Sequence, residues 1–168
     1  GGATYTAGVQ FDDNKSRFVA NTGVVNSASV GAYTITGSTT ETPIALADTP
    51  VKILGTSVDN AITQKFTHAN NRMTYVGAIQ RDFSIICALS ATSGNNKTLG
   101  FLVAKNGVVV AETESITTTS GNGRAEGVSV QGVLLMTTDD YIEIWVENTT
   151  DAANVTVEAM NVIISALN

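Results

Sequence analysis

The chain has only one cysteine and one histidine among its 168 residues, and only two prolines. A single cysteine excludes an intrachain disulfide, and a single histidine excludes a metal site built on a histidine pair. Cys87 lies in "FSIICALS", an apolar setting that is typical of an inert core thiol. A chain of this length can bury roughly 70% of its unfolded surface, so its core requires neither a disulfide nor a metal.

Charged residues are also scarce. They make up 14% of the chain, give a net charge of −6 and form no basic cluster. This argues against nucleic acid or an anionic membrane surface as the main partner. No apolar run approaches the ~20 residues that a membrane span needs. The abundance of Thr, Ser, Asn, Gly and Val predicts a soluble protein made of strands joined by turns.

No arrangement of residues indicates catalysis. The nucleophile pattern GxSxG is absent, and no pair of carboxylates suggests glycoside hydrolysis. "DDNKS" begins like a calcium loop at Asp12, but its sixth position is Arg17 instead of glycine and its twelfth is Gly23 instead of glutamate. Asp139 and Asp140 precede a strand, where such residues usually bond their own turn. We therefore expect no enzyme, no cofactor and no bound metal.

Short β-rich runs bounded by Gly, Asn, Asp and Ser recur along the chain, and helical spacing is absent. About ten short strands without helices predict an all-β sandwich or barrel. The predicted strands are Ala32–Thr36, Thr49–Gly55, Ile62–Phe66, Arg72–Val76, Phe83–Ser90, Thr98–Lys105, Val108–Glu114, Gly127–Met136, Tyr141–Glu147 and Val155–Ala166.

The strongest local signal is "GFLVAKNGVVVAE". Its Asn106 and Gly107 can both adopt the positive φ angles of a type I′ turn. We therefore predict that Leu102–Lys105 pairs antiparallel with Val108–Ala111.

The composition and patterning of the sequence change near "GSTTET" at Gly37–Thr42. The residues before it are polar and weakly patterned. We predict an N-terminal arm or attachment segment over residues 1–42 and a β-domain over residues 43–168. The alternative is that residues 1–42 supply the first strands of the same domain.

Three predicted strands have apolar side chains on both faces. Tyr141–Glu147 alternates, as a strand with one buried face should. "IICAL", "VLLM" and the final "VII" do not alternate, and no helix is available to cover a second face. A second copy of the sheet is the simplest cover, although sandwich corners and loops are alternatives. The predicted interface residues of this homo-oligomer are Ile85, Cys87, Leu89, Val133, Leu135, Val162, Ile163 and Ile164.

"NNRMTYVG", "FSIICALSATSGNNKTLGFLVAKNGVVV", "VLLMTTDDYIEIWVEN" and "VTVEAMNVIISAL" together resemble the TNF-like and complement-type globular heads. The resemblance covers roughly Pro43 to Asn168. It implies a ten-stranded antiparallel jelly roll that assembles as a homotrimer. It also implies that Tyr141–Glu147 lies in the outer sheet, and that the final strand lies centrally in the inner sheet, which faces the threefold axis.

"SGNNKTLGFLVAKNG" and "DDYIEIWVENTTDAANVTV" more specifically resemble small jelly rolls of tailed-phage virion proteins, such as capsid decorations and fibre heads. Aromatic residues are only 6% of the chain, unlike in animal cytokines. The resemblance implies a structural protein on the virion surface, bound to capsid or fibre proteins through residues 1–42. The alternative is a tail-fibre or receptor-binding head whose loops Ser93–Lys97 and Thr118–Glu126 recognise a host glycan or protein.

Overall fold

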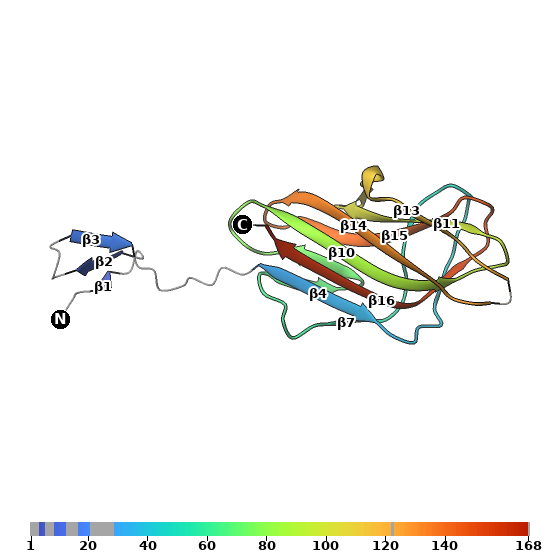
Figure 1. Ribbon diagram of the computed structural model, residues 1–168, viewed down its shortest axis with the longest axis horizontal. Helices are drawn as coiled ribbons and strands as arrows, with labels where there is room; N and C mark the ends of the chain where they lie inside the picture. Colours follow the sequence, from blue (N-terminus) through green and yellow to red (C-terminus); the bar gives the residue numbers. More distant parts are fainter. Residues whose placement is uncertain (1–3, 6–8, 13–16, 21–28, 122, 168) are drawn as a thin grey trace.

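The computed structural model describes residues 4–5, 9–12, 17–20, 29–121 and 123–167. Residues 30–166 form two antiparallel sheets packed face to face (Figure 1). Near the N-terminus, the short strands β1 (Thr4–Tyr5), β2 (Val9–Asp12) and β3 (Arg17–Ala20) pair antiparallel in a sheet of their own. Among the described residues, no helix is long and apolar enough to cross a membrane.

The first sheet, called sheet I, contains the two longest strands of the chain. In spatial order it consists of β14 (Glu126–Met136), β10 (Arg81–Thr92), β16 (Val155–Ala166), β4 (Val30–Ile35) and β7 (Ser57–Asp59), and β5 (Glu41–Thr42) pairs with the start of β16. The final strand therefore lies in the middle of its sheet, as the resemblance implied.

The second sheet, sheet II, covers one face of sheet I. Its spatial order is β12 (Val108–Val109), β11 (Thr98–Lys105), β15 (Tyr141–Asn148), β9 (Arg72–Tyr75) and β8 (Phe66–Ala69), with β13 (Ser115–Thr118) paired to β11 and β6 (Val51–Lys52) paired to β15. A short 3-10 turn, η1 (Ala111–Thr113), connects β12 to β13.

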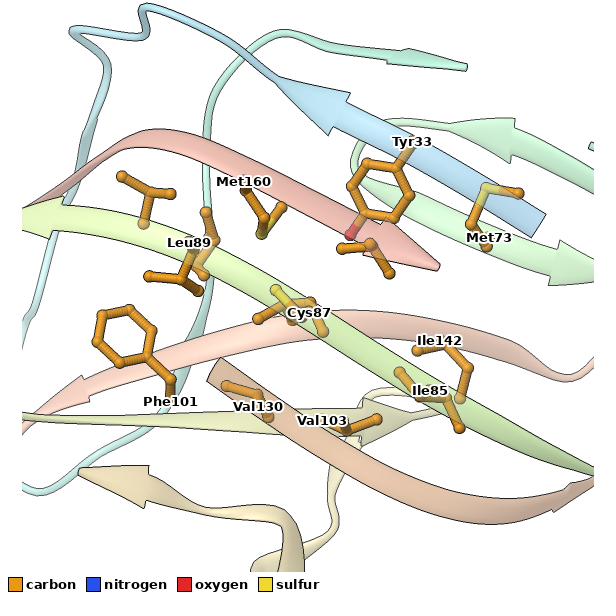
Figure 2. Close-up of a cluster of buried hydrophobic side chains, with 14 of the residues drawn as sticks. Tyr33, Met73, Ile85, Cys87, Leu89, Phe101, Val103, Val130, Ile142 and Met160 are labelled. Atoms are coloured by element: carbon orange, nitrogen blue, oxygen red, sulfur yellow. The ribbon is translucent and has the colours of Figure 1, made fainter. Parts of the chain in front are cut away.

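The core fills the space between the two sheets. Figure 2 shows Ile85, Cys87 and Leu89 projecting from β10 into this space, where they meet side chains such as Phe101 from β11 and Tyr33 from β4. These side chains alternate along each strand because successive residues of a strand point to opposite faces. The core is therefore built from every second residue of the long strands.

A β-bulge resets this alternation in β16. Ser90 of β10 lies opposite Ala159, while Ala91 lies opposite Val157, so Glu158 is an extra residue in β16. A bulge places two residues of one strand against one residue of its neighbour. As a result, Val157 on one side of the bulge and Met160 on the other both point into the core.

Most of the predicted strands are confirmed. Thr98–Lys105 and Val155–Ala166 have the predicted bounds, and five others agree within two residues at each end. The Asn106–Gly107 turn is also confirmed, with φ angles of 54° and 75°, although only Lys105 and Ala104 pair with β12.

Three predicted strands have the wrong extent. Thr49–Gly55 shortens to Val51–Lys52, and Ile62–Phe66 fails because the strand begins at Phe66. Val108–Glu114 ends after Val109, because the hydroxyl of Thr113 accepts a hydrogen bond from the backbone N–H of Val103 at 2.9 Å and so replaces a strand partner.

The predicted domain boundary at residue 42 is too late. β4 pairs with β16 along six residues, and its Tyr33 and Ile35 are at most 2% exposed. The sandwich therefore begins at Val30, and this part of the chain follows the alternative in which it supplies a first strand. The attachment role of the residues before β4 stays a prediction.

Candidate oligomer interface

The eight predicted interface residues divide between the two faces of sheet I. Five of them point into the core and are at most 6% exposed: Ile85, Cys87, Leu89, Val162 and Ile164. They cannot reach a second copy while the two sheets remain packed, so they are core residues of one subunit. Burial raises the pKa of the Cys87 thiol to about 12, in keeping with the predicted inert thiol.

The other three predicted residues lie on the outer face of sheet I, the face turned away from sheet II. Val133 is 60% exposed, Leu135 48% and Ile163 38%. Ile86, which the prediction missed, is 49% exposed on the same face. It lies directly opposite Ile163. The signal was present in "IICAL", where the prediction chose the residues of the wrong parity.

These four side chains belong to a face with very little charge. Residues that lie opposite one another on neighbouring strands form a row across the sheet. From the row of Ser84 to the row of Ser90, none of the outward residues on the three long strands is charged. They are Val133, Gln131, Ser129 and Gly127 on β14, Ser84, Ile86, Ala88 and Ser90 on β10, and Ser165, Ile163, Asn161 and Ala159 on β16. Strands this long that carry uncharged, partly apolar outer faces are typical of surfaces that another protein covers.

Small side chains leave a shallow hollow on this face. Its volume is about 360 Å³, and it lies over β4, β10 and β16. The side chains on the outer face that line it are Thr34, Thr36, Ala88, Ser90, Ala159 and Asn161. The outer face therefore combines a ridge of large side chains at Ile86 and Ile163 with a depression one row further along the strands.

The outer face of sheet II is different, because it carries the buried carboxylate of Glu143 together with basic side chains that bind it. Glu143 is 2% exposed, and its carboxylate contacts Lys52 Nζ at 3.1 Å, Arg72 Nη2 at 2.9 Å and Trp145 Nε1 at 3.0 Å. Burial opposes ionisation, but these donors outweigh it and hold the pKa of Glu143 below its ordinary value. Arg72 also lies 3.7 Å from the ring centre of Tyr141. Glu143, Arg72, Tyr141 and Trp145 thus form one connected group on this face.

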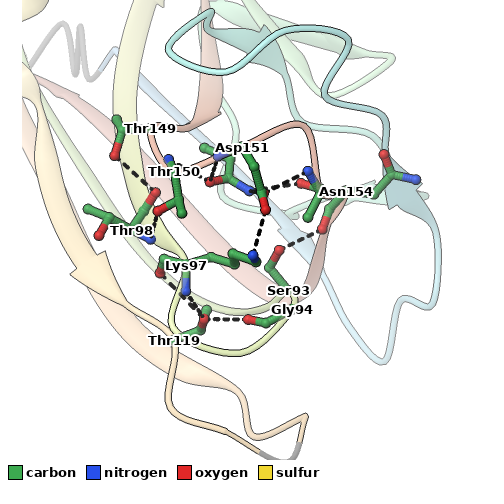
Figure 3. Close-up of polar contacts among 11 residues, drawn as sticks. Ser93, Gly94, Lys97, Thr98, Thr119, Thr149, Thr150, Asp151 and Asn154 are labelled. Carbon is green, nitrogen blue, oxygen red and sulfur yellow. Dashed lines mark hydrogen bonds and ion pairs between the residues drawn. The ribbon is translucent and has the colours of Figure 1, made fainter.

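The loops at the end of the sandwich opposite the C-terminus are polar and tied together (Figure 3). Lys97 Nζ lies 2.5 Å from Asp151 Oδ2, and the hydroxyl of Thr119 donates to the carbonyl of Gly94 at 2.6 Å. The hydroxyl of Ser93 donates to the carbonyl of Asn154 at 2.8 Å. These contacts join the loops predicted to face a receptor and give them a defined shape.

The structure also places the residues considered for metal binding or catalysis. Asp140 accepts a hydrogen bond from the N–H of Thr137 at 2.8 Å, so it is a turn residue as predicted. Among residues 29–121 and 123–167, no cluster of acidic, histidine or cysteine side chains could hold a metal. His68 shares a 2.8 Å hydrogen bond with Ser57 and stacks on Tyr33, which links β8 to sheet I. The side chains around Asp12 lie outside the described residues.

No protein-family model and no curated protein matches the chain. Several solved structures do match its fold. Murine APRIL at pH 5.0 superposes with a TM-score of 0.57 at 10% identity, covering 83% of this chain and 99% of that one. The chain has the TNF-like jelly-roll fold. Eiger TNF from S. frugiperda gives a TM-score of 0.52 at 10% identity and covers 84% of this chain and 93% of its own.

A vertex protein shares the same TNF-like fold. PRD1 vertex protein P5 superposes with a TM-score of 0.50 at 12% identity, covering 83% of this chain and 96% of that one. The resemblance to TNF-like heads, first drawn from short sequence stretches, is therefore confirmed for the fold. At these identities the likeness concerns architecture alone, so the role of this TNF-like chain must come from its own surfaces.

Proposed function

We propose that this chain is a non-enzymatic structural protein of a phage virion, displayed on the surface as a capsid decoration or head fibre. Three copies close around a threefold axis through the outer faces of sheet I. The residues before β4 fasten the trimer to another virion protein. The observation that carries the proposal is the part of the outer face of sheet I between the rows of Ser84 and Ser90, which carries no charge on the three long strands and has Ile86 and Ile163 at its centre.

The magnitude of the buried surface favours association. Full burial of an aliphatic side chain contributes about 1.5–3 kcal/mol. Four side chains that are roughly half exposed, namely Ile86, Val133, Leu135 and Ile163, therefore contribute on the order of 3–6 kcal/mol per copy. Three copies together therefore gain about 9–18 kcal/mol, whereas forming a trimer takes two association steps that cost about 4–15 kcal/mol each, so this burial is of the size that assembly needs.

The place where the chain enters β4 supports attachment of the sandwich at one end. The N–H of Ala166 donates to the carbonyl of Ser29 at 3.0 Å, so the chain enters β4 beside its own C-terminal end (Figure 1). The hydrogen-bonded polar loops lie at the opposite end of the sandwich. Attachment through residues 1–29 would therefore hold this end of the sandwich against another protein. The polar loops at the opposite end would then point outward. The likeness to a vertex protein also supports a place on a virion.

Native mass spectrometry of the purified full chain tests the assembly. We expect a trimer at micromolar concentration. Ile163→Asp and Ile86→Asp should shift the population to monomer, because each places a charge in the proposed contact. Ile116→Asp is a matched control: Ile116 is 61% exposed, but it lies on β13 of sheet II. A wild-type monomer under these conditions would contradict the proposal.

The attachment is tested on purified virus particles that contain the chain. Lys15 is the sole lysine before β4. Amine-reactive cross-linking followed by mass spectrometry should join Lys15 or the terminal amine to a different virion protein. Cross-links from Lys97 at the polar end should remain within the trimer. If Lys97 instead of Lys15 carries the links to the other protein, the orientation is reversed and the anchoring role is wrong.

The second candidate is a tail-fibre or receptor-binding head. The observation that favours it is the rigid polar surface formed by Lys97, Asp151 and the neighbouring loops (Figure 3). On a glycan array, a reproducible hit that Lys97→Ala abolishes and Lys52→Ala preserves would favour recognition of a host surface. Without such a hit, the structural role stands as the better proposal.

A further inference from the structure

An exposed valine stands beside the hollow on the outer face of sheet I. Val58 lies on the edge strand β7, and its apolar side chain is 63% exposed. The hollow is about 360 Å³, begins on the neighbouring strand β4 and extends over β16 to β10. No charged side chain lines it. The outer face therefore carries a projecting apolar side chain and a depression that could accept one.

The strand register places the valine and the hollow in one row across the sheet. Val58 lies opposite Thr34, Thr34 lies opposite Asn161, and Asn161 lies opposite Ala88. Around a symmetry axis that runs along the strands, the same row of every copy lies at the same height. The valine of one copy is therefore level with the hollow of the next copy.

We propose that Val58 of each copy packs into the hollow of the next copy in the trimer. This inference rests on the proposed trimer and adds which part of the second copy occupies the hollow. Valine and hollow are different surfaces, so their contact is head-to-tail, and such a contact closes into a ring when the rotation between copies is one third of a turn.

The contact also explains why small residues line this part of the face. Two sheet faces pack about 10 Å apart when their side chains interlock. Ala88, Ala159 and Ser90 are too short to span such a gap, and an unfilled gap would forfeit the contacts of its lining. Val58 of the next copy occupies part of this hollow, while Ile86 and Ile163 form the adjoining part of the contact. Both Val58 and the hollow then have an apolar partner in a neighbouring copy.

A cysteine pair tests this contact directly. In Val58→Cys combined with Asn161→Cys, the two sites of one chain are two strand spacings apart, about 10 Å. A disulfide needs Cα atoms within about 7 Å, so the pair can bond only between copies. Under mild oxidation we expect covalent trimers on a non-reducing gel. Cys87 is fully buried and faces the core, so it does not contribute.

Two controls make the result specific. Each single variant should stay uncross-linked. Val108→Cys with Asn161→Cys should also stay uncross-linked, because Val108 is as exposed as Val58 but lies on β12 of sheet II. As an independent check, Val58→Asp should weaken assembly at least tenfold in a dilution series, while its circular dichroism spectrum stays that of the wild type because the side chain is exposed.

The outcomes separate this inference from the proposed function. Covalent trimers from the Val58 and Asn161 pair support both. A wild-type trimer whose cysteine pair does not cross-link above the Val108 control overturns the contact and leaves the trimer standing. A wild-type monomer in native mass spectrometry overturns the proposed function, and this contact with it.

Discussion

Asn106 donates a hydrogen bond from its side-chain amide to Oδ1 of Asp140 at 2.6 Å, and this bond joins two turns of sheet II. The carbonyl oxygen of the same amide accepts from the N–H of Tyr141 at 2.9 Å. Lys105 completes the contact, with Nζ 2.8 Å from Asp140 Oδ2. The type I′ turn that the sequence predicts is therefore held by a carboxylate 34 residues away.

Asn106→Asp should destabilise the fold. The new carboxylate would face the ionised Asp140 at hydrogen-bond distance and lose the donated bond, at a cost of about 1–3 kcal/mol. Urea unfolding at pH 7 measures the change. Asn70→Asp is the control, because Asn70 is also exposed, has a similar positive φ of 51° and lies in the turn between β8 and β9. Equal stability of Asn106→Asp and wild type would contradict this role for the bond.

Asp140 should also make stability depend on pH. Burial opposes its ionisation, but hydrogen bonds from Lys105, Thr137 and Asn106 outweigh burial and hold its pKa below the ordinary value. A lowered pKa in the folded state contributes stability above the unfolded pKa of about 3.9, and this stability is lost as the pH falls below it. Asp140→Asn should therefore be less stable than wild type at pH 7, and the difference should shrink by pH 2–3. A constant difference in urea unfolding across this range would count against the assignment.

Glu147 predicts the opposite pH dependence. It is 8% exposed, and burial together with the charges of Glu114 and Asp48 raises its pKa. Stability from a raised pKa is fully present below the unfolded value of about 4.3 and is lost as the pH rises through the folded value. Glu147→Gln should therefore stabilise the protein at pH 7 by about 1 kcal/mol, because it removes a buried charge beside two others.

The effect of Glu147→Gln should disappear near pH 3–4, where the wild-type carboxyl is protonated. Thermal unfolding at pH 3.5 and pH 7 measures both values. Glu112→Gln, on the exposed turn η1, is the control and should change neither. A destabilised Glu147→Gln at pH 7 would show that the carboxylate has a favourable partner.

Cys87 should be chemically silent in the native state. Its thiol is fully buried, and burial raises its pKa to about 12. An aromatic disulfide reagent at pH 8 should therefore react with it only in denaturant, since reaction needs the thiolate and access. One equivalent of rapid reaction under native conditions would contradict the position of this residue in the core.

The contrast between sequence and structure is sharpest in β16. The run Val162–Ile164 correctly predicts a strand with apolar side chains on both faces, but it cannot say which side chain belongs to which face. That choice depends on the bulge at Glu158 and on the register with β10, which are set by pairing across the sheet. Only Ile163 of the three is exposed.

β4 shows a second limit of sequence patterns. The sequence predicts a strand at Ala32–Thr36 but places it in the arm, because the residues before Gly37 are polar and weakly patterned. Packing requires glycine at position 31, because a Cβ there would lie 2.7 Å from Met73 Cε and 2.9 Å from Phe66 Cγ. The small residue is needed because sheet II approaches closely. This requirement arises from residues far away in the chain.

The final prediction concerns Gly132, which lies within β14, the edge strand of sheet I. The turn η1 packs directly on this glycine. A Cβ at Gly132 would lie 2.6 Å from the methyl carbon of Thr113. Thr113 cannot easily move, since its hydroxyl accepts from Val103 N–H at 2.9 Å and donates to the carbonyl of Val110 at 2.7 Å. Gly132→Ala should therefore destabilise the fold by about 1–3 kcal/mol, as overpacking does.

A matched glycine and a second-site change separate this clash from a general effect of glycine replacement. Gly127→Ala lies on the same strand, where the new Cβ would meet only a carbonyl at 4.0 Å, and it should be neutral or slightly stabilising. Thr113→Ser removes the clashing methyl and keeps the hydroxyl, so the double variant Gly132→Ala with Thr113→Ser should recover most of the lost stability. Because the cycle isolates one contact, full additivity of the two changes in urea unfolding would mean that η1 does not rest on Gly132.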